Sequence, residues 1–329
     1  MSALGAWLWR WGVSFASLVG GLLTLFVFRR GLPHVGWIIG YLLLLFLLVG
    51  VLVQVRDVLQ ASDKRAHRLM LTATEYTVQT LYHGVLLFLL PAYWAATTLG
   101  SPNVWLLALL ALLALLTSID PWYRAAVRRW RWINHVLFFV SMFAGLNLAL
   151  PLVGTPPFAA LLLAAWLAVA GLIPTVRRAR HWPWLTALVV TSLAGLATAG
   201  LVGRWCVVVP PAPMFLARAE LGWTVGTVDS MEPTPSAIHA GDLHERGLVA
   251  RTAIYAPAGL RQPVEHVWRR EGRVVNVVRL TPVQGGRRDG FRTFSRKTAF
   301  PPDAVGRWTV DVTTEAGQLI GRLRFRVVP

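Results

Sequence analysis

The residues whose types and spacing best suit chemistry lie late in the sequence, in the segment GGRRDGFRTFSRK at residues 285–297. This segment holds five basic residues and two phenylalanines. If it is a strand, Arg292, Phe294 and Arg296 share one face, because side chains alternate along a strand. Arginine forks match phosphate and carboxylate groups, and an aromatic ring offers its face to a sugar or a cation. The pattern predicts a site for an anionic or sugar-containing ligand, with Lys297 at its end.

The same pattern also fits a solvated strand. Charged side chains on an edge strand keep it from pairing with other chains, so the arginines alternatively indicate an exposed strand face without a ligand. His266 is included among the predicted ligand-binding residues, although its alternation with Val264 and Trp268 is more typical of a hydrogen-bonded core histidine. No second histidine, cysteine or carboxylate lies nearby at metal-binding spacing, so the sequence predicts no metal and no cofactor.

A second group of polar residues lies within an apolar part of the sequence. Glu75, Gln79 and His83 are four residues apart in TATEYTVQTLYHG, so one helix face carries all three. Asn134 and His135 begin a later apolar segment. Ionisable groups inside a membrane often mark proton or substrate pathways, but polar side chains there also join helices by hydrogen bonds. The sequence leaves both interpretations open.

Ser230 lies in DSMEPTP, which is similar to the nucleophile box of bacterial signal peptidases, and AGD at 240–242 is similar to the segment that follows that box. Those enzymes pair the serine with a lysine of lowered pKa, which acts as general base. The equivalent position precedes Arg273 in EGRVVNVV, where no lysine is present, and Lys297 is the only lysine after Ser230. The sequence therefore favours a chance similarity, and we assign no catalytic residue.

The elements that position these residues belong to a membrane protein. Of 329 residues, 55% are hydrophobic and 14% are charged, with a mean hydropathy of +0.55, whereas about a quarter of a soluble domain is charged. The formal net charge is +17. In the first part of the chain the basic residues occupy short loops between apolar runs, where they indicate membrane topology. Cys206 is the only cysteine, which excludes an intrachain disulfide.

A membrane-spanning helix needs about 20 mostly apolar residues, and the sequence predicts a bundle of about seven such spans. With seven spans, the N-terminus and the loops near 56–72, 120–131 and 176–183 share one side. That side carries twelve lysines and arginines, against two in the opposite short loops. The positive-inside rule makes the first side cytoplasmic. The predicted spans are 12–28, 36–55, 74–97, 103–119, 132–152, 157–175 and 184–203.

The composition changes after VVVPPAPM, and apolar residues then alternate with polar ones. In QLIGRLRFRVV at 318–328 this alternation predicts a half-buried strand with an arginine stripe outside. About six short strands at similar spacing predict an all-β, immunoglobulin-like sandwich. The predicted domains are a transmembrane helical domain at 1–204, a linker and lead-in segment at 205–246, and an extracytoplasmic β-sandwich at 247–329.

Three segments of this region, IYAPAGLRQPVEHVW, GGRRDGFRTFSRKTAFP and GRWTVDVTTEAGQLIGRLRF, resemble an uncharacterised bacterial membrane-protein family. The C-terminal module of that family is the domain of unknown function 2914. The resemblance covers most of residues 247–328, and the apolar spans are similar only as a generic multi-spanning region. It implies a membrane-anchored envelope protein and no specific activity. The matching residues are His266, Trp268, Arg292, Ser295, Lys297, Trp308, Gly317, Gly321 and Phe325.

These observations predict a multi-pass protein of the bacterial inner membrane, with a cytoplasmic N-terminus and a periplasmic or extracellular sandwich that serves as a binding or scaffold module. The expected partners are membrane lipids and an anionic polysaccharide, a lipid headgroup or a protein; an oligomer is compatible with the sequence, and no nucleic acid is expected. The alternative function is a transporter or membrane-embedded enzyme built on Glu75, Gln79 and His83, and a serine-lysine peptidase at Ser230 is a more distant one. No Walker loop, dinucleotide fingerprint or zinc-protease motif is present, which argues against nucleotide-driven or zinc chemistry. The sequence leaves enzymatic activity open and favours a protein that is not an enzyme.

Overall fold

The computed structural model describes residues 45–46, 49, 65–225, 227–234 and 237–329. The chain divides into two compact units, and each is described by itself. The first contains the helices up to Arg204. The second contains Trp205–Pro329 together with two short connections, Tyr93–Val104 and Leu150–Phe158.

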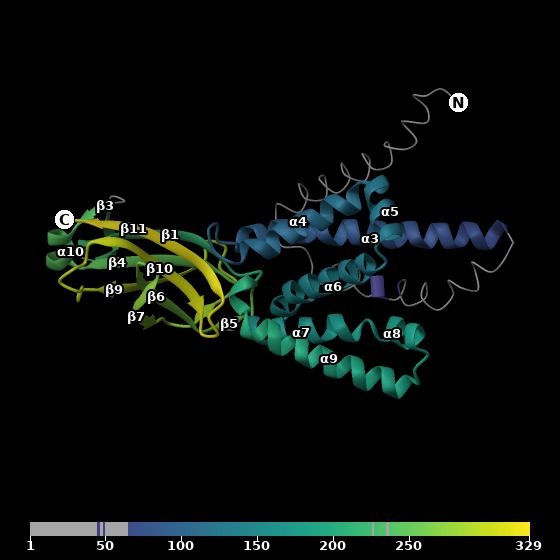
Figure 1. Ribbon diagram of the computed structural model, residues 1–329. Helices are drawn as coiled ribbons and strands as arrows, with labels where there is room; N and C mark the ends of the chain where they lie inside the picture. The colour runs from purple at the N-terminus through teal and green to yellow at the C-terminus, as the bar shows by residue number, and fades with distance from the viewer. Residues whose placement is uncertain (1–44, 47–48, 50–64, 226, 235–236) are drawn as a thin grey trace, which may run out of the picture. The chain divides into compact units, whose positions relative to one another are not determined.

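The first unit is helical where the structure describes it (Figure 1). Its helices are α3 (Arg65–Ala96), α4 (Val104–Ser118), α5 (Asp120–Arg129), α6 (Trp132–Leu152), α7 (Pro157–Ala170), α8 (Ile173–Arg180) and α9 (Trp184–Arg204). The longest described helix, α3, continues through Pro91. Helices α4, α6, α7 and α9 are shorter and more apolar, whereas the short helices α5 and α8 carry several arginines.

Three stretches of this unit are long and apolar enough to span a membrane: Trp132–Leu152, Pro157–Arg180 and Trp184–Arg204. A fourth is added if α4 and α5, which meet at 104°, form one bent span. The prediction of a seven-span bundle is therefore wrong, because the described residues provide only three or four. The predicted span at 12–28 and most of that at 36–55 lie outside the described residues.

Two local features explain why apolar length overestimated the spans. The stretch predicted at 74–97 lies in α3, where polar side chains interrupt the apolar run. The span predicted at 103–119 ends at Ile119, whose φ of −109° and ψ of 95° are extended rather than helical. Pro121 follows in the first turn of α5. Because proline has no N–H group and its ring clashes with the carbonyl four residues earlier, Pro121 favours a break between α4 and α5.

The second unit is a β-sandwich of two main sheets, as the alternation of apolar and polar residues predicted, with a small two-stranded sheet of β5 and β8 (Figure 1). The four-stranded sheet has the order β2-β1-β4-β9, and the five-stranded sheet has the order β3-β11-β10-β6-β7. The strands are β1 (Phe215–Val225), β2 (Thr227–Pro233), β3 (Ala237–His239), β4 (Leu248–Tyr255), β5 (Arg261–Gln262), β6 (Val264–Arg270), β7 (Arg273–Arg279), β8 (Val283–Gln284), β9 (Phe291–Lys297), β10 (Gly306–Thr314) and β11 (Leu319–Val328).

The prediction of an all-β, immunoglobulin-like sandwich needs two corrections. Helix α10 (Ala240–Arg246) lies between β3 and β4, so the unit is not all-β. The strands β3 and β11 run parallel, whereas an immunoglobulin domain is built from antiparallel sheets. The segment at 205–246, predicted as linker and lead-in, contains β1, β2, β3 and α10. Three strands of the sandwich thus precede residue 247.

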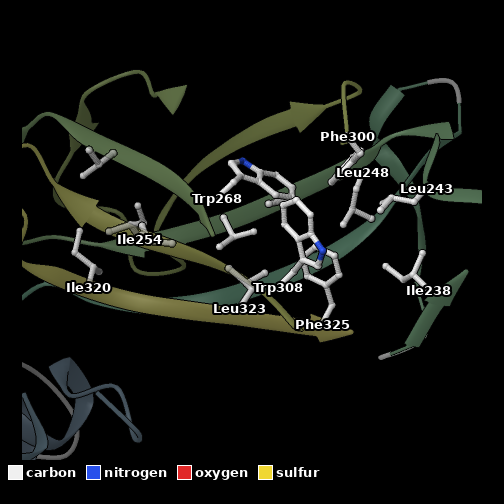
Figure 2. Packing of buried hydrophobic residues seen from close by; sticks show 14 of the residues in the cluster. Ile238, Leu243, Leu248, Ile254, Trp268, Phe300, Trp308, Ile320, Leu323 and Phe325 are labelled. Carbon is white, nitrogen blue, oxygen red and sulfur yellow. The ribbon is translucent and has the colours of Figure 1, made fainter. Parts of the chain in front are cut away.

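The two sheets enclose one hydrophobic core (Figure 2). Trp268 on β6 and Trp308 on β10 are almost completely buried, and Phe325 on β11 packs against both, with ring-centre distances of 6.3 and 6.0 Å. Aromatic pairs of this kind contribute about 0.5–1.5 kcal/mol each beyond the burial of their area. Gly321 on β11 leaves room for Leu216 of β1, because an added Cβ atom would lie 2.6 Å from the Cδ2 atom of Leu216.

Candidate functional site

The segment with the predicted ligand-binding residues forms β9, an edge strand of the four-stranded sheet. Its side chains alternate, so that Arg292, Phe294 and Arg296 are exposed while Thr293 and Ser295 are buried. Phe294 keeps 50% of its surface exposed. Residues on one strand face repeat about every 6.8 Å, so the Cα atoms of the two arginines are about 14 Å apart with the ring between them. We refer to Arg292, Phe294 and Arg296 as the basic-aromatic face.

The arginines of the basic-aromatic face differ from most arginines of the sandwich. Neither Arg292 nor Arg296 forms an ion pair with a carboxylate in the part of the chain that the structure describes. An exposed guanidinium of this kind binds a phosphate or carboxylate without first giving up an internal partner. Eight other arginines of the unit do pair with carboxylates: Arg218, Arg246, Arg251, Arg269, Arg270, Arg279, Arg307 and Arg322.

The neighbouring strands add little free charge to this face. On β4, Arg251 lies opposite Phe294 and donates a hydrogen bond of 2.6 Å to Glu220 on β1. That hydrogen bond, together with one from Arg218, lowers the pKa of the Glu220 carboxyl group. These charges are therefore engaged with one another. The free positive charge of the four-stranded sheet lies at its β9 edge.

The buried side of β9 belongs to a polar network between the two sheets. The Ser295 hydroxyl lies 2.8 Å from Nδ1 of His266 and accepts a hydrogen bond of 3.2 Å from the indole N–H of Trp268. The other ring nitrogen of His266 lies 3.1 Å from the Thr252 hydroxyl. His266 has no exposed surface, and burial lowers its pKa to about 4, so the ring is neutral at pH 7. The network joins β4, β6 and β9 and holds the basic-aromatic face outward.

Lys297 lies on the same buried side as this network. Its Nζ atom is 5.2 Å from the ring centre of Phe300, and burial lowers the pKa of its ammonium group. The sequence grouped Lys297 and His266 with the basic-aromatic face as predicted ligand-binding residues. The structure places both in the interior, away from a ligand that contacts the exposed side of β9.

Within the helical unit, Gln79 of α3 meets the break between α4 and α5. Its side-chain amide donates hydrogen bonds of 3.2 Å to the Thr117 carbonyl oxygen and 2.6 Å to the Asp120 carboxylate. In a continuous helix the Thr117 carbonyl would accept from the residue four positions later, which is Pro121 and has no N–H. Gln79 therefore provides the donor that the proline lacks.

The other polar residues predicted in this unit lie in different surroundings. His83 is buried, and its Nδ1 atom is 3.0 Å from the Ser118 hydroxyl at the end of α4. Glu75 and His135 are exposed, and Asn134 is half-buried and accepts a hydrogen bond of 3.4 Å from a tyrosine of α5. The partners of Gln79 and His83 agree with the interpretation that these side chains join helices by hydrogen bonds.

Among the residues whose positions are described, the structure does not place Ser230 near a lysine that could act as its general base. Ser230 lies in β2 and Lys297 in β9, which are the two opposite edges of the four-stranded sheet. Neighbouring strands are about 4.8 Å apart, so three intervals place the two strands about 14 Å from each other. A serine and its general base must be within hydrogen-bond reach, so these two residues do not form a catalytic pair.

Several partners of these residues were not predicted. An acidic residue followed by proline is typical of the first turn of a helix, so the sequence could have indicated a new helix beginning at Asp120 and Pro121. Thr252 and Ser118 have no local signal, because their partners come from other strands and helices. In the described ranges, no cluster of three or more histidine, cysteine, aspartate or glutamate residues could hold a metal ion.

Comparison with protein families matches two parts of the chain. Residues 261–327 match the Protein of unknown function (DUF2914), which confirms the resemblance of the C-terminal region. Residues 4–250 match the Family of unknown function (DUF5924). No curated protein and no solved structure matches the chain. Because the match over residues 4–250 covers most of its length, the chain belongs to the Family of unknown function (DUF5924).

Proposed function

We propose that this protein is a membrane scaffold whose β-sandwich binds an anionic polysaccharide of the cell envelope through Arg292, Phe294 and Arg296. The proposal is carried by one observation: among the described residues, two exposed arginines without a carboxylate partner flank an exposed aromatic ring on one strand. Charge-assisted, two-point hydrogen bonding from arginine to carboxylate or phosphate is the strong interaction that such a surface offers.

The spacing of the face favours a polymer. The arginine Cα atoms are about 14 Å apart, so a ligand that engages both carries at least two anionic groups along its length. Phe294, placed between them, offers apolar surface to the C–H face of a sugar unit. An acidic polysaccharide supplies both features. Lipid headgroups and acidic protein segments supply only the charge, and they are the other outcomes of the test.

The membrane part of the proposal rests on the three apolar stretches. In Pro157–Arg180 and Trp184–Arg204, only 28% and 22% of the apolar window is buried, so most of it is available to lipid. The connections at 120–131 and 176–183 carry seven arginines, and the positive-inside rule makes their side cytoplasmic. With three spans from residue 132 onward, the chain leaves the membrane at residue 204 on the opposite side. We place the sandwich outside the cytoplasmic membrane of a bacterium on this basis.

The test uses the full-length protein in nanodiscs of neutral phosphatidylcholine, immobilised for surface plasmon resonance. Three probes are compared: polygalacturonate, neutral dextran, and vesicles that contain phosphatidylglycerol. We expect saturable binding of polygalacturonate that persists between about 50 and about 200 mM salt, since direct contacts are screened less than distant charges. The double variant Arg292→Gln/Arg296→Gln should lower this affinity by about tenfold or more, because it removes two charge-assisted contacts.

The matched control removes the same charge elsewhere. Arg261 and Arg326 are exposed, so Arg261→Gln/Arg326→Gln lowers the net charge equally without altering β9. If both double variants weaken binding to the same degree, or if dextran binds as well as polygalacturonate, the proposed site is wrong. Binding of the phosphatidylglycerol vesicles alone would replace the polysaccharide with a lipid surface as the partner.

A further inference from the structure

The five-stranded sheet ends in β7, an edge strand that is apolar rather than basic. β7 has the sequence RVVNVVR and is the edge strand of the five-stranded sheet, where its single neighbour is β6 (Figure 1). Val274, Val275 and Val277 have 52%, 40% and 47% of their surface exposed. β-branched side chains favour strands and are seldom left in water in such numbers on one short strand. β7 is therefore an exposed apolar edge.

The usual protections against strand pairing are absent from the middle of β7. Edge strands are normally blunted by a charge, a proline or a covering segment, and the exposed face of β9 carries Arg292 and Arg296. Between Arg273 and Arg279, β7 contains only valines and one asparagine. A strand that pairs on one side has a second row of amide groups pointing away from its neighbour. No described residue is hydrogen-bonded to that outer row in the ladder, because β7 ends the sheet.

We propose that β7 accepts an extended segment of another protein as an added strand, and that this segment has an apolar centre with an acidic residue at each end. The charge of β7 selects these ends. Arg273 is exposed, and Arg279 has 83% of its side chain exposed with only a long contact of 3.5 Å to Glu265. Opposite charges that face each other across two strands stabilise the pair, and like charges oppose it.

The same rule disfavours a second copy of this chain as the occupant. If two copies of β7 paired antiparallel with Asn276 facing Asn276, Arg273 of each copy would lie opposite Arg279 of the other. That pairing juxtaposes like charges twice, whereas an acid-ended segment forms two opposite-charge pairs in the same register. The backbone hydrogen bonds would supply affinity, and the valines together with the two arginines would supply specificity.

The experiment measures fluorescence polarisation of a labelled peptide, Glu-Val-Thr-Val-Thr-Val-Glu, with the full-length protein in neutral detergent. Two further peptides serve as controls: one with lysine at both ends, and one whose alternate amides are N-methylated and cannot donate. We expect the acid-ended peptide to bind, and the other two to bind at least about tenfold more weakly, which corresponds to ~1.4 kcal/mol.

Reversing the two charges of β7 distinguishes a loss of specific binding from a loss of folding. In Arg273→Glu/Arg279→Glu, the acid-ended peptide should lose about tenfold in affinity and the lysine-ended peptide should gain a similar factor. A misfolded variant cannot show that gain. Arg261→Glu/Arg326→Glu, which reverses two exposed charges elsewhere, should change neither affinity beyond a general salt-dependent effect. Equal binding of all three peptides would overturn the proposal. A concentration-dependent dimer that Val277→Lys abolishes would overturn it in favour of self-pairing.

Discussion

The side-chain amide of Gln79 donates a hydrogen bond of 3.2 Å to the Thr117 carbonyl oxygen, the acceptor that Pro121 leaves without its usual helical donor. Gln79 is almost completely buried, with 5% of its surface exposed. In apolar surroundings a backbone carbonyl without a partner costs about 1–3 kcal/mol. One glutamine on α3 therefore makes the bend between α4 and α5 tolerable where water is scarce.

Replacing this donor should destabilise the helical unit. Gln79→Met keeps the length of the side chain but leaves the Thr117 carbonyl and the Asp120 carboxylate without the bonds that Gln79 donates. We expect the free energy of unfolding in detergent to fall by about 2 kcal/mol. Thr80→Val, at an exposed position on the next residue of α3, is the control and should change it little. Urea denaturation followed by circular dichroism measures both.

The cause is tested by restoring the backbone donor. Pro121→Ala restores the N–H group that a continuous helix would donate to the Thr117 carbonyl. If the helix continues in that variant, Gln79→Met should cost less in the Pro121→Ala background than in the natural sequence. A double-mutant cycle gives the coupling free energy directly. If the cost of Gln79→Met is the same in both backgrounds, the glutamine does not compensate for the proline, and its bond to Asp120 becomes the relevant one.

A second prediction concerns pH and follows from His266. Burial lowers the pKa of His266 to about 4 in the folded protein, whereas an unfolded histidine has a pKa of about 6.5. Between these values the unfolded chain binds a proton that the folded chain does not. Stability of the sandwich is therefore fully present above pH 6.5 and is lost as the pH falls toward 4, by up to about 3 kcal/mol.

The variant His266→Gln isolates this contribution. Glutamine does not titrate and retains polar atoms for Thr252 and Ser295, so the variant should be less stable at pH 7.5 but should lose less on acidification to pH 4.5. The comparison of urea midpoints at the two pH values cancels the contributions of the other titrating groups. A pH dependence identical to that of the natural protein would show that His266 does not titrate between folded and unfolded states.

The sequence revealed the face of His266 but not its partners. Its alternation with Val264 and Trp268 favoured a hydrogen-bonded core position, and the residue is completely buried. Thr252 and Ser295, which bond to it, lie 14 and 29 residues away and reach it only because β4 and β9 pack over β6. Local periodicity decides which side of a strand is inward, but the strand that lies across the core depends on the topology of the whole sandwich.

In the helical unit, the sequence located apolar stretches but overestimated how many of them span a membrane. Apolar length is a sound criterion for stretches such as Trp132–Leu152 and Trp184–Arg204, which are long enough to span a membrane. The same criterion also counted the stretches at 74–97 and 103–119 as spans, although α3 carries the polar face that the sequence displays and α4 has only 15 residues before the bend. It also overlooked β1 and β2, because the segment at 205–246 was judged by its prolines rather than by its strands.

The last prediction concerns Asp311, which joins three adjacent strands. Only 4% of its side chain is exposed, and it accepts hydrogen bonds from Arg269 on β6 at 3.0 Å and from Arg322 on β11 at 2.8 Å. Removing one partner of a fully buried ion pair costs about 3–5 kcal/mol. Arg269 and Arg322, which would remain, keep 32% and 22% of their side chains exposed, so we expect a cost at the lower end of this range. Asp311→Ala should therefore lower the free energy of unfolding by about 3 kcal/mol in urea denaturation.

The matched control is the exposed ion pair between Glu271 and Arg307, which are 3.0 Å apart at one end of the same sheet. Glu271→Ala should change the urea midpoint little, because water solvates both charges once the pair is broken. A third variant separates charge from packing. Arg269→Met/Asp311→Leu/Arg322→Met replaces the cluster with apolar side chains and should be far less destabilising than Asp311→Ala alone, since no unpaired charge remains. If Asp311→Ala and Glu271→Ala lower the free energy of unfolding equally, water reaches Asp311 as freely as it reaches the sheet surface. The cluster would then not stabilise the alignment of β6, β10 and β11.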